Sequence, residues 1–238
     1  MRDFDDIWVY LSASPLLHLT LTLVVYQAAS WVYSKTNNNP LANPVLLAVV
    51  VIVAILVLTG TRYETYFEGA QFVHFLLGPA TVALAIPLYR QFAHVRKSAV
   101  ALLSSIVLGS LTATISAVAI AWMLNAQEAS IIALAPKSVT APVAMAISEQ
   151  LGGLPSLTAA LVMLTGITGA MLGPVLLNLM GITDWQVRGV AIGTASHGIG
   201  TARALQVNEV AGAFSGLAMG LNAIATAILL PLLWRLFF

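Results

Sequence analysis

The chain has 238 residues, of which 59% are hydrophobic and 8% charged, with a formal net charge of +1 and a mean hydropathy of +0.93. Soluble domains carry about 25% charged residues because their surface faces water, so this composition excludes a soluble protein and predicts an all-α membrane helix bundle. The near-neutral charge argues against a nucleic-acid partner, and the lack of cysteine excludes disulfides, thiol catalysis and thiolate metal sites.

Five apolar runs are predicted to cross the membrane as regular helices, because a hydrocarbon core of about 30 Å needs about 20 apolar residues. In chain order these runs cover about 15–32, 44–59, 98–124, 157–180 and 210–233. The first run follows acidic residues rather than the basic region of a secretory signal, and no Arg/Ser-rich transit peptide precedes it. We therefore expect this run to be retained in a multi-pass protein of the bacterial inner membrane.

Three further apolar segments, about 66–91, 128–149 and 185–206, are interrupted. The interruptions are Gly78-Pro79, Ala135-Pro136-Lys137 and the small, polar run 193–201. Proline removes a backbone donor and glycine loosens a helix, so each segment is predicted to be two half-helices meeting in the membrane or a re-entrant hairpin. The whole chain, 1–238, is expected to form one transmembrane domain with about seven to eight membrane segments, some of them discontinuous. The stretch 77–82 aligns with 134–139 as a weak repeat, and the sequence leaves open whether it is parallel or inverted.

Basic residues give a prediction of orientation. Arg90, Arg96 and Lys97 cluster between two segments, so their loop is expected to face the cytoplasm. The bias elsewhere is slight, since Arg2, Arg62 and Arg188 are expected to fall on the opposite side.

The first two interruptions suit an anion. Half-helices beginning near Ala80 and Ser138 would point unpaired N–H groups and positive dipole ends into the membrane. An ammonium beside the second break, at Lys137, costs about 2.5–3.5 kcal/mol by insertion scales, so a carboxylate substrate is its expected counter-ion. Alternatively, Lys137 reaches an interface or pairs with Glu128 or Glu149. The predicted binding residues at these breaks are Pro79, Thr81, Lys137, Ser138 and Thr140.

The third interruption adds a second polar group to the predicted site. His197 is expected to bind an anion or shuttle protons, since its reference pKa lies near neutrality. Arg203 is a candidate bidentate clamp for a carboxylate. Alternatively, His197 only bonds a neighbouring helix and Arg203 lies at the cytoplasmic surface. The predicted binding residues of this run are Ser196, His197, Gly200, Thr201 and Arg203.

Three stretches resemble the signature segments of the LrgB/CidB family of membrane proteins. They are Ala135-Pro-Lys-Ser-Val-Thr-Ala-Pro-Val-Ala-Met145, Gly193-Thr-Ala-Ser-His-Gly-Ile-Gly-Thr-Ala-Arg-Ala204 and Leu76-Leu-Gly-Pro-Ala-Thr-Val-Ala-Leu-Ala-Ile-Pro-Leu-Tyr89. The Pro-Lys-Ser and Ser-His-x-x-Gly-Thr cores are not generic apolar patterns, and the resemblance extends over nearly the whole chain from about Leu41.

The resemblance implies two functions. The family includes antiholin-like regulators of murein hydrolase export and cell lysis, and also plastid carriers of glycolate and glycerate, with bacterial members linked to pyruvate. Its bacterial members usually act with a smaller LrgA/CidA-like membrane protein, which is an expected partner here. The lipid bilayer is expected from the composition, and a homodimer from the glycine ridges, such as Gly212, Gly216 and Gly220, and from the small size of one subunit.

The leading hypothesis is therefore a carrier of small monocarboxylates that works by alternating access, with proton coupling or exchange. The alternative is an antiholin-like regulator or an oligomeric pore. An enzyme is not expected, because adjacent residues such as Ser196 and His197 point apart on a helix and make a poor nucleophile–base pair. No cofactor or metal is expected.

Overall fold

The computed structural model describes residues 15–36, 39, 42–76, 79, 82–83, 85–90 and 92–237. Helices joined by short turns make up this part of the chain, and no strand occurs in it. The helices pack as two units, Met1–Ala83 and Leu84–Phe238. The predicted all-α membrane bundle is thus confirmed for the described residues, whereas the expectation of a single domain stays a prediction.

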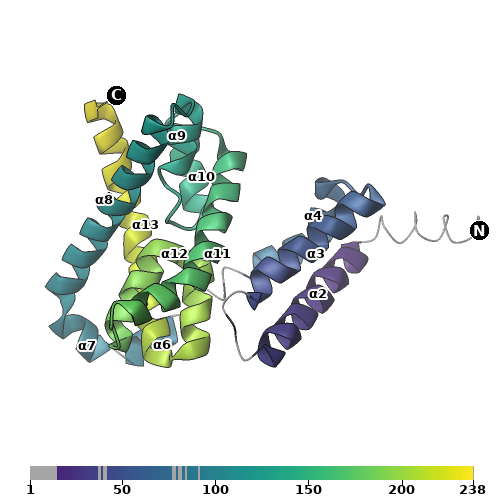
Figure 1. Ribbon diagram of the computed structural model, residues 1–238, viewed down its shortest axis with the longest axis horizontal. Helices are drawn as coiled ribbons and strands as arrows, with labels where there is room; N and C mark the ends of the chain where they lie inside the picture. The colour runs from purple at the N-terminus through teal and green to yellow at the C-terminus, as the bar shows by residue number, and fades with distance from the viewer. Residues whose placement is uncertain are drawn as a thin grey trace, which may run out of the picture. The chain divides into compact units, whose positions relative to one another are not determined.

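The first unit holds α2 (Pro15–Lys35), α3 (Pro44–Thr59) and α4 (Tyr63–Phe75), with α2 packed on the other two (Figure 1). The start of α3 is fixed by Asn43, whose Oδ1 accepts hydrogen bonds from two backbone N–H groups of the first turn at 2.9 and 3.2 Å. Its end is fixed by Gly60, which adopts a φ of 65° that disfavours other residues. Local capping therefore sets both ends of the most apolar helix.

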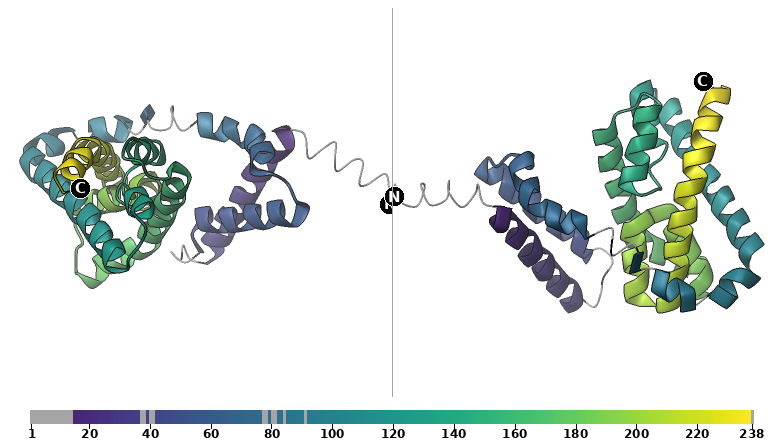
Figure 2. Two further views of the ribbon diagram at one scale, coloured as in Figure 1. Left: turned by 90° about the horizontal axis from the view of Figure 1, so that it is seen from above. Right: turned by 180° about the vertical axis from the view of Figure 1, so that it is seen from behind.

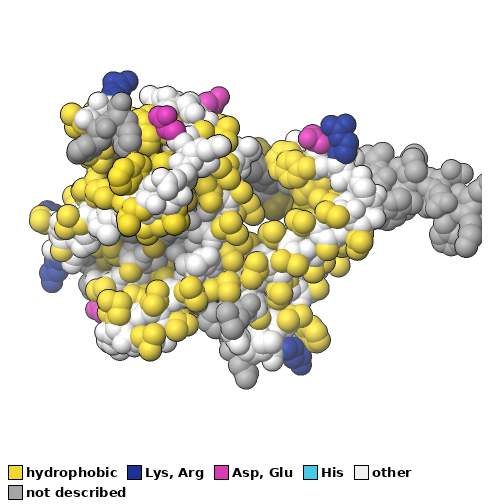
Figure 3. Space-filling view, turned by 45° about the horizontal axis from the view of Figure 1, so that its top comes forward, with side chains coloured by type: hydrophobic (Ala, Val, Ile, Leu, Met, Phe, Trp, Pro, Cys, Tyr) yellow, Lys and Arg dark blue, Asp and Glu magenta, His cyan; other side chains and the backbone are white. Residues whose placement is uncertain are grey.

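The second unit contains the remaining helices. They are α6 (Ala85–Arg90), α7 (Phe92–Lys97), α8 (Ala99–Met123), α9 (Glu128–Leu134), α10 (Ala141–Gln150), α11 (Pro155–Leu179), α12 (Trp185–Val207) and α13 (Glu209–Phe237). In the described chain, α2, α8, α11 and the part Glu209–Leu236 of α13 are long and apolar enough to cross a membrane. On the face shown in Figure 3, hydrophobic side chains are widespread and charged side chains are few, as a lipid-facing surface requires.

The segment 128–150 folds back on itself as a hairpin, here called the first hairpin. Its two helices, α9 and α10, are separated by six non-helical residues, 135–140. Gly153, just beyond α10, lies so close to Ile132 of α9 that an added Cβ would stand 2.6 Å from Ile132 Cγ2. The end of α10 is therefore beside α9, so this segment enters the bundle and returns to the same side.

The segment 185–207 forms a second hairpin, because α12 is sharply bent at His197 (φ 41°, ψ −135°). Ile192 and Ala204 belong to one buried cluster, although they would lie about 18 Å apart along a straight helix. A Cβ at Gly200 would stand 2.8 Å from Ile192 Cγ2, so only glycine lets the two halves approach this closely. Both broken segments of this unit are confirmed as interrupted, and both are re-entrant hairpins.

The two hairpins enter from opposite sides of the second unit (Figures 1 and 2). The turn at Asn125 joins α8 to the first hairpin, and α11 then runs back to the start of the second hairpin. We call these two sides the Asn125 side and the Ser98 side, after the residues that flank α8. The apices of both hairpins meet between them, inside the bundle.

This topology corrects one prediction. Because segment 128–149 does not cross, Arg188 lies on the same side as Arg96 and Lys97, and not opposite to them. Arg203 lies there too, since it shares a small cavity with Arg188 near the outer end of the second hairpin. The only described basic residue near the other end of the unit is Arg235, at the end of α13. This excess of basic residues on the Ser98 side supports the prediction that this side is cytoplasmic.

Candidate functional site

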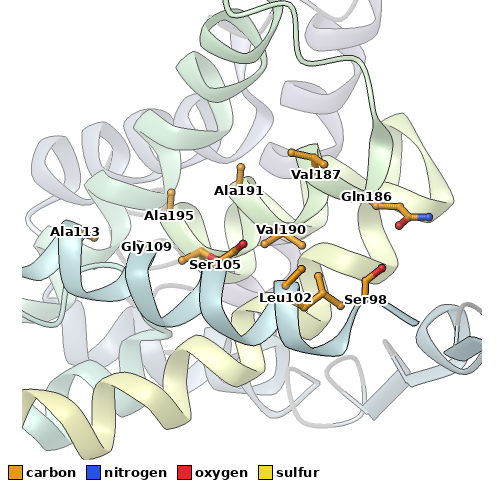
Figure 4. A pocket seen from close by; sticks show the side chains of 12 residues that line it. Ser98, Leu102, Ser105, Gly109, Ala113, Gln186, Val187, Val190, Ala191 and Ala195 are labelled. Carbon is orange, nitrogen blue, oxygen red and sulfur yellow. The ribbon is translucent and has the colours of Figure 1, made fainter. Parts of the chain in front are cut away.

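A groove of about 460 Å³ runs between α8 and the first half of α12 (Figure 4). Its lining consists mostly of small and apolar residues with a few polar ones: Ser98, Ala101, Leu102, Ser105, Gly109, Ala113, Gln186, Val187, Val190, Ala191, Thr194 and Ala195. It begins on the Ser98 side and ends at Ala113 and Ala195, about 22 Å further along α8. The groove, called here the central groove, is therefore longer than half the thickness of a hydrocarbon core of about 30 Å.

Lys137 adjoins the inner end of the central groove. It lies at the apex of the first hairpin, and its Nζ donates to Ala113 O at 3.5 Å and to Ser138 Oγ at 3.4 Å. Both bonds are long and neither partner is charged. In the described part of the chain, no ion pair joins this ammonium to Glu128 or Glu149. Within the described residues, Lys137 is therefore a half-buried cation held by neutral oxygens alone.

Asn222 of α13 ties the two apices together. Its Nδ2 donates to Ser138 O of the first hairpin at 3.2 Å and to Thr194 O of the second hairpin at 3.0 Å. Broken helices leave carbonyl groups without their usual partners, and a buried carbonyl needs one. One fully buried amide thus serves carbonyls of two hairpins that enter from opposite sides.

The second apex is fixed by its own hydrogen bonds. His197 Nε2 donates to Val162 O of α11 at 2.9 Å. Thr201 Oγ1 lies 2.8 Å from His197 O and 2.9 Å from Ser215 Oγ of α13. His197 therefore bonds a neighbouring helix, which is the structural alternative considered above, and its role in proton transfer stays a prediction.

Two glycines of α11 make room for this apex. A Cβ at Gly166 would stand 2.6 Å from His197 Cε1, and one at Gly169 would collide with Ser196 Oγ. Ser196 and His197 are both buried. The bend of α12 therefore fits against a face of α11 that has no side chains at these two positions.

Each apex also presents the N-terminus of a half-helix. The first is that of α10, which begins at Ala141, three residues later than the predicted start near Ser138. Thr140 is its N-cap and makes no side-chain capping bond. The second half of α12 begins just after His197. Two positive dipole ends therefore point into the interior of the unit.

Three buried oxygens near the apices have no hydrogen-bond partner among the residues that the structure describes: Thr194 Oγ1, Ser196 Oγ and Asn222 Oδ1. Buried polar atoms are bonded in the great majority of native structures, so this unused capacity indicates a place that binds polar molecules. Thr194 and Asn222 were not among the predicted binding residues. Asn222 is a single amide side chain within an apolar run, and this pattern in the sequence could have identified it as a candidate site residue.

The structure brings most of the predicted residues to the two apices. Lys137, Ser138 and Thr140 belong to the first, and Ser196, His197, Gly200 and Thr201 to the second. Arg203 does not join them, because it lines a cavity of about 40 Å³ with Trp185 and Arg188.

The first break, at 78–79, belongs to the first unit. Pro79 is an exposed helical residue of the first unit, and Thr81 lies outside the described residues.

Comparison with known proteins gives one family. The chain matches the LrgB-like family over residues 22–236. It is 38% identical to YwbG of Bacillus subtilis over 218 residues, which cover 92% of this chain and 96% of YwbG. It is 33% identical to the holin-like protein CidB of Staphylococcus epidermidis over 229 residues, covering 96% and 99% of the two chains. No solved structure matches the chain significantly.

Proposed function

Because this chain belongs to the LrgB-like family of multi-pass membrane proteins, we propose that it carries small monocarboxylate anions across the bacterial inner membrane by alternating access. The observation that carries this proposal is Lys137, a cation in an apolar segment whose partners among the described residues are neutral oxygens. Intramembrane charges are costly and usually serve function, and a carboxylate would neutralise this one.

The surroundings of Lys137 favour an anion over other solutes. The N-termini of α10 and of the second half of α12 add positive partial charge at the apices. No described carboxylate forms an ion pair in this region. The central groove, lined mostly by small and apolar residues with a few polar ones, has room for a small organic acid.

The groove also supplies an access path. Its outer end lies at Ser98, directly after Arg96 and Lys97, and these charges would raise the local concentration of anions. We propose that this end is the cytoplasmic entrance of the path, because the groove begins here beside basic residues. Movement of the two hairpins against α8 would then close this path and open another on the Asn125 side.

Counter-flow in liposomes tests the proposal. The purified protein is reconstituted, and uptake of labelled pyruvate, glycolate and glycerate is measured with and without unlabelled acid inside. A carrier gives saturable uptake that internal acid accelerates. Linear, unselective uptake together with leakage of unrelated solutes would contradict the proposal, and repeating the assay across a pH gradient separates proton coupling from exchange.

A second function is favoured by the names of relatives. CidB of Staphylococcus epidermidis and CidB of Staphylococcus aureus are both called holin-like, the latter being 31% identical to this chain over 223 residues. An antiholin-like regulator or oligomeric pore would act with an LrgA/CidA-like membrane protein or as a homodimer. A pore leaks solutes without saturation and a regulator without its partner gives no uptake, so the same liposome assay distinguishes both from a carrier. In neither case do we propose an enzymatic activity.

A further inference from the structure

A small cavity near the outer end of the second hairpin lies on a different face of α12 from the central groove. Trp185 and Arg188 line this cavity, whereas their neighbours Gln186 and Val187 line the central groove. Arg203 lines it as well, so we call it the arginine cavity. Its other lining residues are apolar and include Leu177, Ile192 and Val207. The arginine cavity is therefore separate from the proposed path of the substrate.

The two arginines of this cavity come from different halves of α12. Arg188 precedes the bend at His197 and Arg203 follows it, and both side chains are half-buried. Two positive charges that share a cavity of about 40 Å³ repel each other. No carboxylate is among the described residues that line the cavity. An anion bound between the two guanidinium groups would remove this repulsion.

The guanidinium group of Arg188 is held in place by neutral groups. Its Nη1 donates to Asn178 Oδ1 at 2.8 Å and to Ile182 O at 2.7 Å. Its Cζ lies 5.3 Å from the centre of a ring of Trp185. Within the described residues, its Nε and Nη2 groups make no hydrogen bond. Arg188 is therefore oriented by the protein and keeps N–H groups for a further acceptor.

Asp184, one turn before Arg188, is the nearest carboxylate along the chain. Its Oδ1 accepts hydrogen bonds from the backbone N–H groups of Gln186 and Val187 at 2.7 and 3.1 Å, so it caps the start of α12. The ion pairs found among the described residues do not include one between Asp184 and Arg188. The carboxylate best placed in the sequence to neutralise Arg188 thus has another role.

We propose that the arginine cavity binds the phosphate group of an anionic phospholipid from the cytoplasmic leaflet. Guanidinium groups match the oxygen atoms of a phosphate, and basic pockets between membrane helices on the cytoplasmic side bind anionic headgroups. The indole of Trp185 is 40% exposed, and tryptophan favours the headgroup level of a bilayer. One phosphate would contact Arg188 and Arg203 together and so join the two halves of α12. This inference does not depend on the proposed carrier function.

The surroundings favour a lipid over free phosphate. The lining apart from Arg188 and Arg203 is apolar or aromatic, so it offers the remaining phosphate oxygens few further donors. A lipid keeps its glycerol and acyl chains in the membrane, where the exposed apolar surface of the helices is also expected to lie. The cytoplasmic leaflet is in addition rich in anionic lipids.

Native mass spectrometry of the purified protein in detergent tests the ligand. Phosphatidylglycerol, which is anionic, and phosphatidylcholine with the same acyl chains, which is zwitterionic, are titrated separately. Phosphatidylglycerol is expected to bind about 10-fold more tightly or better. Equal affinities would overturn the proposal. Excess inorganic phosphate should leave bound phosphatidylglycerol in place, and its displacement would show a site for free phosphate and overturn the assignment to a lipid.

A pair of substitutions tests the cavity. Arg188→Gln combined with Arg203→Gln is expected to lower the affinity for phosphatidylglycerol by about 10-fold or more. The matched control, Arg62→Gln combined with Arg235→Gln, removes the same number of charges elsewhere, and its affinity should stay within about 2-fold of the wild type. Equal losses in both would show general attraction of anionic lipid and overturn the proposal.

A single substitution guards against misfolding, because Arg188 also bonds Asn178 and Ile182. If the double variant does not fold, Arg203→Gln is compared with Arg235→Gln in the same titration. A lower affinity in Arg203→Gln alone supports the cavity as the binding site, and equal affinities in the two variants would overturn it.

Discussion

His197 Nε2 and Val162 O lie 2.9 Å apart, and this hydrogen bond holds the bend of α12 against α11. The bend itself is unusual, because His197 has a φ of 41° and a ψ of −135°, a region that glycine tolerates and other residues rarely enter. The apex of the second hairpin is therefore a strained turn stabilised by a contact from a crossing helix.

This strain predicts an order of stability for two variants. His197→Ala and His197→Gly both lose the bond to Val162, but only glycine adopts the backbone angles without strain. His197→Gly should therefore be more stable than His197→Ala by about 1 kcal/mol or more. Thermal unfolding of the purified variants measures the difference. Equal melting temperatures would show that the bend is not strained.

The glycine face of α11 predicts a loss of stability on adding one methyl group. Gly169→Ala would push against Ser196 Oγ at the apex, at a cost of about 1–3 kcal/mol for overpacking. Gly220→Ala is the control, since nothing lies within 4 Å of its added Cβ. A lowered melting temperature is expected for the first variant and none for the second. Equal stability of both would contradict the close packing of α11 and α12.

The re-entrant first hairpin predicts the labelling of single cysteines in this naturally cysteine-free chain. Gln127→Cys and Gln150→Cys flank the hairpin and should react with a membrane-impermeant thiol reagent from the same side of the membrane. Thr183→Cys, between α11 and α12, should react from the other side. If 128–149 crossed the membrane once, Gln127→Cys and Gln150→Cys would label from opposite sides.

Substrate should protect the central groove. Ser105 lines it, whereas its neighbour Ser104 is exposed elsewhere on α8 and does not. A thiol reagent is expected to modify Ser105→Cys more slowly when a carried acid is present, and to modify Ser104→Cys at an unchanged rate. Equal rates with and without acid at both positions would place the path outside this groove.

Breaks in the membrane helices could be predicted from the sequence, but the path of the chain after each break could not. Pro136 and the glycines after His197 predict interruptions, because proline removes a backbone hydrogen-bond donor and glycine loosens a helix. Whether two half-helices continue or fold back depends on tertiary contacts such as that of Gly153 with Ile132. The predicted side of Arg188 was wrong for this reason. A segment that folds back instead of crossing the membrane changes the side on which every later residue lies.

The candidate site was predictable where a polar side chain stands out in an apolar run, as at Lys137 and His197. The sequence does not indicate which main-chain atoms take part in the site. Ser138 O and Thr194 O accept hydrogen bonds from Asn222 because the two broken helices lie next to each other. This proximity cannot be predicted from the residue types. Arg203 shows the converse, because its charge suggested a clamp while the fold places it beside Arg188.

The central claim, that Lys137 binds the carried anion, is tested most directly by counter-flow of labelled monocarboxylate through Lys137→Met. This variant keeps the length of the side chain and removes its charge, and Lys35→Met, on the first unit and in contact with Trp31, is the control. We predict that Lys137→Met accumulates in the membrane but loses saturable uptake, by about 100-fold or more if a charge-assisted bond of some 3 kcal/mol is removed, while Lys35→Met transports normally. Wild-type counter-flow in Lys137→Met would contradict the account.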